Sequence, residues 1–160
     1  MQKIKFLEST MLLLILLFVS STTSTIKTFK NLNANETTYF SFTKGDVTND
    51  KEAWDILFER TNLGIKNAAI ILDKKFDELT VAPKEGYVVE TKDKKSIPSG
   101  SGNGWYKYSM SDHSINPLPG KTLVVKTSDN KFVKVEILSY YKDLNGDSGY
   151  YTFRYEFIAQ

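Results

Sequence analysis

The chain has 160 residues, the length of about one domain. Its 21 Lys and Arg residues nearly balance 19 Asp and Glu residues, for a formal net charge of +2, which argues against a dedicated nucleic-acid binder because such proteins need a concentrated basic surface. There is no cysteine and one histidine, His113, which excludes disulfides, cysteine nucleophiles, thiolate metal sites, cysteine-linked lipid anchors and zinc sites built from several histidines.

The first residues have the three-part pattern of an export signal. Lys3 and Lys5 form a short basic region, and an unbroken apolar run of nine residues follows at 11–19. Small residues begin at Ser20, so we expect residues 1–21 to be a cleaved signal peptide. The run is shorter than the roughly 20 residues of a membrane-spanning helix, and an uncleaved anchor is the alternative. The sequence therefore predicts an exported protein that is secreted, periplasmic or associated with the cell surface, without a cysteine-linked lipid.

Short β-rich segments separated by turn residues fill the remainder of the chain. After a polar lead-in at 22–36, a β domain is expected over 37–160. Apolar and polar residues alternate with the period of two that is typical of strands. The one segment that could be helical, 73–79, is short and interrupted by charges. The strands expected before the C-terminal third are 38–43, 54–58, 68–72, 87–91 and 104–110.

The C-terminal third has the clearest pattern. Expected strands at 122–126, 132–141 and 150–157 are separated by turn-forming segments, which predicts an antiparallel meander. Asn130, in the first turn, tolerates the left-handed backbone conformation. The alternation is out of phase near Phe132, which predicts a β-bulge there. The predicted fold class is all-β, with a single domain of packed antiparallel sheets.

Five short motifs follow one another along residues 37–157. They are YFSFTKG at 39–45, WDILFERTN at 54–62, GWYKYS at 104–109, LVVKTSDNKFVK at 123–134 and YTFRY at 151–155. Together and in this order they resemble the strand motifs of the HmuY-like haem-binding proteins of Bacteroidota.

The resemblance implies a β-sandwich that is exported and works with haem uptake at the outer membrane. The best-known members hold haem between two axial side chains, either two His or two Met; such members take haem from host proteins and pass it to a TonB-dependent receptor. One axial ligand of the family lies directly after the strand at 104–109, where this chain has Met110. The other lies upstream, and the corresponding stretch 91–103 contains neither His nor Met. Haem is thus the implied cofactor, with Met110 as a candidate axial ligand.

Met110 is the only methionine beyond the predicted signal peptide. A thioether sulfur can bind haem iron axially. The predicted strand places Tyr106, Tyr108 and Met110 on one face, which would suit a flat apolar macrocycle. The alternative is that Tyr106 and Met110 pack in the core, where methionine commonly fills gaps.

His113 lies in the polar loop that follows and is the alternative ligand, since imidazole binds haem iron. An exposed loop histidine without such a role is the other interpretation. Two residues separate His113 from Met110, and three steps of extended chain reach about 10 Å, which is hardly enough to pass around a porphyrin edge. We therefore expect one of them at most to ligate a given haem. A five-coordinate haem and a haem shared between two chains both remain open.

The other polar clusters favour structural roles. The stretch 143–147 imitates the start of a calcium loop but lacks the later Gly and Glu, so a hairpin loop is the better interpretation. Asp50, Glu52 and Asp55 are interpreted as a solvated face. The sequence has no phosphate-binding glycine loop or nucleophile elbow, so we predict no enzyme activity. A haem-less recognition or adhesion module on the same β-sandwich is the alternative function, because the upstream ligand is missing.

Overall fold

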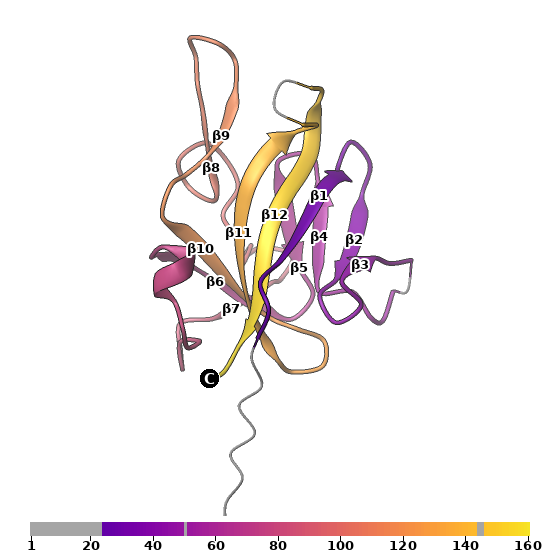
Figure 1. Ribbon diagram of the computed structural model, residues 1–160, viewed down its shortest axis with the longest axis vertical. Helices are drawn as coiled ribbons and strands as arrows, with labels where there is room; N and C mark the ends of the chain where they lie inside the picture. Colours follow the sequence, from indigo (N-terminus) through magenta and orange to yellow (C-terminus); the bar gives the residue numbers. More distant parts are fainter. Residues whose placement is uncertain (1–23, 50, 144–145) are drawn as a thin grey trace, which may run out of the picture.

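The structure is a computed structural model that describes residues 24–49, 51–143 and 146–160. Two antiparallel sheets make up most of this part of the chain, and a separate two-stranded hairpin projects from one end (Figure 1). The predicted all-β fold class is confirmed. The predicted signal peptide at 1–21 lies outside the described residues and stays a prediction.

The larger sheet has six strands in the order β1-β12-β11-β10-β6-β7. Its centre is the predicted meander, since β10, β11 and β12 are consecutive antiparallel neighbours. The predicted position of the bulge is wrong: Phe132 pairs in register with Ile158, and the register shifts lie between Ile137 and Tyr141. The strands are β1 (Lys27–Asn33), β6 (Ala68–Asp73), β7 (Val88–Val89), β10 (Lys121–Lys126), β11 (Phe132–Tyr141) and β12 (Ser148–Ile158).

Strand β1 lies within the stretch expected as a polar lead-in. It pairs with β12 at the edge of the larger sheet. Its sequence is mostly polar, and Leu32 is its one buried residue. The sheet therefore begins well before residue 37.

The smaller sheet has four strands in the order β3-β2-β4-β5. Strand β2 begins at the predicted residue, whereas β5 was not predicted. A tight turn at Arg60, whose φ is 50°, joins β4 to β5. The strands are β2 (Thr38–Ser41), β3 (Asp46–Val47), β4 (Ile56–Glu59) and β5 (Asn62–Ile65).

Aromatic rings from both sheets fill the space between them. Alternate residues of β12 point inward, so Tyr151, Phe153 and Tyr155 are buried. The Phe153 ring lies 5.2 Å from that of Phe40 on β2 and 5.3 Å from that of Phe58 on β4, centroid to centroid. Such contacts stabilise the pair of sheets beyond the apolar area that they bury. The molecule is therefore a β-sandwich with one shared core.

The segment between β6 and β7 covers the outer face of the larger sheet. The segment 73–79, the one that could have been helical, contains a single 3₁₀ turn, η1 (Phe76–Glu78). Leu79 and Ala82 pack on Val124 of β10 and form a second, smaller core. This cover buries part of a face that would otherwise meet water.

Lys134 of β11 is buried beneath this cover. Its ammonium donates hydrogen bonds of 2.9 Å to the carbonyl oxygens of Phe76 and Leu79. It also forms an ion pair of 2.9 Å with Glu156 and lies 4.3 Å from the centre of the Phe76 ring. A buried charge needs such partners to offset its lost hydration. Lys134 thus ties η1 to the sheet.

Asp55 is also buried, so its assignment to a solvated face is wrong. One carboxylate oxygen accepts the N–H of Phe42 at 2.8 Å, and the other accepts the N–H of Ser128 at 2.6 Å. Phe42 follows β2 in the smaller sheet, and Ser128 lies in the turn between β10 and β11. Glu52 is exposed, and Asp50 lies outside the described residues. Asp55 therefore links the two sheets.

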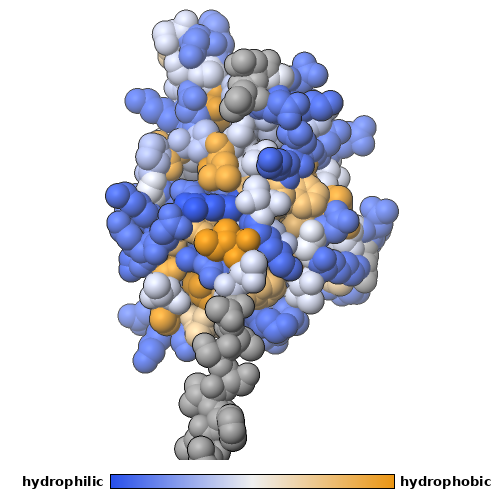
Figure 2. Space-filling view, viewed as in Figure 1, coloured by the Kyte–Doolittle hydropathy of each residue, from blue (hydrophilic) through white to orange (hydrophobic). Residues whose placement is uncertain are grey.

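Apolar side chains on the face with β1 and β12 form separate spots among polar ones (Figure 2). A single large apolar patch, the usual mark of a protein–protein surface, is not seen on this face of the described chain. Within the described residues, no helix is long and apolar enough to span a membrane.

Candidate functional site

The candidate ligands lie on the projecting hairpin, which consists of β8 (Tyr106–Tyr108), β9 (Ile115–Pro117) and the tip at 109–114. Tyr108 is the last residue of β8 and pairs with Ile115. Directly beyond it, the Ser109 N–H donates to the Ser114 carbonyl oxygen at 2.8 Å and closes the turn. The strand predicted to reach residue 110 therefore ends two residues early.

Side-chain hydrogen bonds attach the hairpin to the sandwich. The Ile115 N–H donates to the Tyr141 hydroxyl of β11 at 2.7 Å. The Tyr108 N–H donates to the Ser101 hydroxyl at 2.8 Å, so the stretch 91–103 contributes to the site without offering it a His or Met. These bonds fix the direction in which the hairpin projects.

A buried aromatic layer lies at the base of the hairpin. The Trp105 indole donates to the Thr61 carbonyl oxygen at 3.0 Å, and its ring lies 4.9 Å from that of Tyr106 and 5.1 Å from that of Tyr151. Burial raises the pKa of the Tyr151 hydroxyl. Burial also raises the pKa of the Tyr140 hydroxyl, although the positive charge of Arg60 acts to lower it. Tyr106 is 8% exposed and belongs to this layer. The base is therefore a buried aromatic support for the hairpin.

Met110 lies in the turn beyond β8 and is 77% exposed. It does not continue the strand face of Tyr106 and Tyr108, so the predicted single face is wrong, because the chain turns at Ser109. Packing of Met110 in the core, the alternative prediction, is also wrong. Its thioether is left accessible to a ligand.

His113 is exposed at the tip, with a φ of 58°. Its Nδ1 atom lies 2.5 Å from the Tyr108 hydroxyl oxygen. Hydrogen bonds from the side chains of Ser109 and Ser114 hold the pKa of the neighbouring Asp112 below its ordinary value. The Asp112 carboxylate accepts hydrogen bonds from the N–H and the hydroxyl of Ser114. These bonds hold the carboxylate within the turn.

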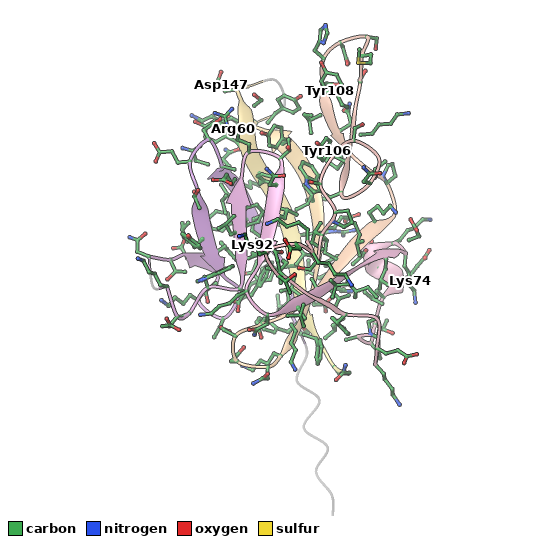
Figure 3. All side chains as sticks on the ribbon, turned by 180° about the vertical axis from the view of Figure 1, so that it is seen from behind. Arg60, Lys74, Lys92, Tyr106, Tyr108 and Asp147 are labelled. Atoms are coloured by element: carbon green, nitrogen blue, oxygen red, sulfur yellow. The ribbon has the colours of Figure 1, made fainter. Side chains whose placement is uncertain are left out.

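The sequence indicated Tyr108 and His113 separately but not the pair that they form. Figure 3 labels Tyr108 near the end of the hairpin and Tyr106 closer to the body. Five positions separate Tyr108 from His113, a spacing that brings two side chains together across a tight hairpin turn. That spacing was the signal in the sequence, but it indicates contact only once the turn is known.

The donor chemistry at the end of the hairpin fits a haem iron. Thioether, imidazole and phenol groups all serve as axial haem ligands in proteins, and Met110, His113 and Tyr108 provide one of each. The described residues contain no group of three or more His, Cys, Asp or Glu side chains that could hold a bare metal ion.

A large hollow lies at the other end of the molecule, where β1 begins and β12 ends. Its volume is about 840 Å³, and Lys131, Phe132, Glu156 and Phe157 contribute to its lining. The candidate ligands do not border it. The donors therefore project from a convex hairpin rather than into this hollow.

Comparisons with known proteins agree with this architecture. The family model described as "HmuY protein" matches residues 33–155. The apo HmuY analogue of Tannerella forsythia is 19% identical, with a TM-score of 0.60 over 86% of this chain and 96% of that one. Apo PinO of Porphyromonas gingivitis is 14% identical, with a TM-score of 0.58 over 86% of this chain and 98% of that one.

A third solved structure comes from Bacteroides vulgatus, and HmuY-like heme binding has been suggested for that protein. It is 19% identical, with a TM-score of 0.56 over 82% of this chain and 90% of that one. No curated protein matches the sequence. At these identities the structural likeness concerns the fold.

Proposed function

The chain belongs to the HmuY family, and from this premise we propose that it is an exported haem-binding protein that captures haem for uptake at the outer membrane. The observation that carries the proposal is the end of the hairpin, where three kinds of haem-iron donor lie within a few residues: Tyr108 at the end of β8, and Met110 and His113 on the exposed turn. The heme binding suggested for the Bacteroides vulgatus neighbour supports it. The expected partners are haem, host haem proteins and a TonB-dependent receptor.

Each part of the hairpin has a distinct role in this proposal. Haem would supply a Lewis-acidic iron and a broad apolar surface. Met110 or His113 would hold the iron, and Tyr108 would contact the macrocycle. The buried base of Trp105 and Tyr106 would support the hairpin and so preserve the position of the donors. Donors at an exposed turn would also leave haem accessible for transfer, as delivery to a receptor requires.

A haem titration tests the proposal. Haem is added to the protein lacking residues 1–21, and absorbance is recorded in the ferric and the dithionite-reduced states. A saturable, shifted Soret band is expected. Its collapse in Met110→Ala would assign the iron to the thioether, and its collapse in His113→Ala would assign it to the imidazole. A flat titration at micromolar haem would overturn the proposal.

The second candidate function is a recognition or adhesion module on the same scaffold. Two observations favour it: the stretch 91–103 has no His or Met, and the large hollow lies away from the candidate ligands. It predicts a flat haem titration together with binding to a protein or glycan. A saturable Soret band that depends on the hairpin tip would exclude it.

A further inference from the structure

The hollow where β1 begins and β12 ends takes no part in the haem site proposed above. Pairing between β1 and β12 stops at Lys27 and Tyr155, whereas β12 runs on to Ile158. Over this last part β12 pairs with β11 among the described strands, and residues 24–27 and 156–159 both border the hollow. Its volume of about 840 Å³ lies within the usual range of small-molecule pockets, about 300–1,000 Å³. The hollow is therefore large enough for an organic ligand.

Apolar side chains form most of the surface of the hollow. Phe157 packs against the core between the two sheets, and Phe132 and Ile158 pack against the smaller outer core. All three are partly buried, so packing fixes their positions. Ile26, which precedes β1, is 48% exposed. These side chains offer a preformed apolar surface, and covering such a surface is the main source of affinity for an organic ligand.

The acidic side chains of the lining already have cations beside them. Glu156 is paired with Lys134 at 2.9 Å, and Asp77 is paired with Arg154 at 3.1 Å. The Lys134 ammonium also donates to two carbonyl oxygens, so all three of its N–H groups are engaged. A cationic ligand would therefore have to compete with these pairs.

Two lysines of the lining can still receive an anion. Lys27 forms no ion pair within the described part of the chain. Lys131 is paired with Asp129 at 2.7 Å, but 59% of the Lys131 side chain and 37% of the Asp129 side chain are exposed. Exposed ion pairs contribute little because water competes for both charges, so Lys131 can exchange this partner for a ligand. Its ammonium lies 5.8 Å from the centre of the Phe157 ring, beside the apolar surface.

We propose that this hollow binds an amphipathic carboxylate, a ligand with an apolar body and an anionic head. Phe132, Phe157 and Ile158 contact the apolar body, and Lys27 and Lys131 receive the carboxylate. The site is separate from the hairpin, so the proposal goes beyond the proposed function. Fatty acids and porphyrins share this chemistry, because each joins an apolar body to a carboxylate.

Isothermal titration calorimetry with laurate, below its micelle concentration, tests the proposal on the protein lacking residues 1–21. Laurate should bind saturably, whereas dodecylammonium, which has the same chain length and the opposite charge, should not. In nuclear magnetic resonance spectra laurate should shift the amides of Phe157 and Ile158 and leave those of the tip at 109–114 unchanged. Displacement of laurate by iron-free protoporphyrin IX would extend the ligand class to porphyrins, and a lack of displacement would restrict it to fatty acids.

Variants at exposed positions separate the two parts of the site. Lys27→Gln combined with Lys131→Gln should weaken laurate binding by about 10-fold, because two exposed charge contacts are lost. Lys30→Gln, on the same strand but outside the lining, is the matched control and should bind as the wild type does. Ile26→Asp should also weaken binding, whereas Val47→Asp should not, since Val47 is 47% exposed on β3 and does not line the hollow.

Three results would overturn the proposal. They are the absence of saturable laurate binding, equal binding of laurate and dodecylammonium, and amide shifts confined to the hairpin tip. Near-ultraviolet circular dichroism should show that every variant keeps its fold, and unchanged laurate affinity in the double lysine variant would contradict recognition of the carboxylate. Met110→Ala and His113→Ala should bind laurate normally, so the hollow and the haem site can fail independently.

Discussion

The sandwich and the hairpin use their polar side chains in opposite ways. Asp55 is buried between the two sheets, where its carboxylate accepts two backbone N–H groups. Lys134 is buried on the outer face of the larger sheet beneath η1, where its ammonium meets two carbonyl oxygens and Glu156. On the hairpin, Met110 and His113 are exposed, and Tyr108 is partly buried with its hydroxyl next to Nδ1 of His113. Asp55 and Lys134 therefore have structural roles, whereas the candidate site lies on the projecting hairpin.

Asp55→Ala would test the sandwich side of this comparison most strongly. It leaves the buried N–H group of Phe42 and the partly buried N–H group of Ser128 without an acceptor, so the free energy of unfolding should fall by about 3 kcal/mol. Urea denaturation measures the change. Asp55→Asn keeps one oxygen acceptor and should lose less, and the exposed Glu85→Ala should change little. Equal stability of Asp55→Ala and wild type would contradict a structural role.

Lys134→Met should have the next largest effect. The methionine keeps the packing against the Phe76 ring but removes three polar contacts and leaves Glu156 without its cation. Because Glu156 is partly exposed to water, we expect a loss of about 2 kcal/mol rather than the larger figure for a fully buried pair. Adding Glu156→Gln should restore part of it in a double-mutant cycle. Strictly additive single and double variants would argue against coupling.

Tyr141→Phe should have the smallest effect on stability and acts where the two regions meet. It removes the hydroxyl that accepts the Ile115 N–H, so a loss of about 1 kcal/mol is expected. The clearer readout is hydrogen exchange of the Ile115 amide, which should become faster while amides in β12 keep their protection. Tyr87→Phe serves as the control, because the Tyr87 hydroxyl has no hydrogen-bond partner in the described structure. Unchanged exchange at Ile115 would show that other contacts hold the hairpin.

The fold could be predicted where the pattern of a strand is local. The meander of β10, β11 and β12 follows from alternation along each segment, and all three strands lie close to their predicted bounds. Strand β1 could not be predicted in this way, because its polar residues form a strand only through pairing with β12, far along the chain. Strand β5 was not predicted because Gly64 interrupts its alternation and because a tight turn directly precedes the strand.

The candidate ligands could be placed near one another from the sequence, but their geometry could not. The family motif led to Met110 and the ligand chemistry of imidazole led to His113, and both lie on the hairpin tip. Period-two alternation placed Met110 on the strand because nothing in the sequence marks Ser109 as the start of the turn. Asp55 was misplaced for a similar reason: the groups that it binds lie 13 and 73 positions away, which alternation does not detect.

The pairing of β1 with β12 also has a consequence for how the protein folds. These strands come from opposite ends of the described chain, and β12 lies between β1 and β11 in the sheet. The larger sheet therefore cannot be completed until the last strand has been synthesised and has paired with β1 and β11. Contacts between such distant segments form slowly. During that interval β1 and β11 both present open edges, so the unfinished chain is most exposed to aggregation, and to the action of chaperones, just before β12 inserts.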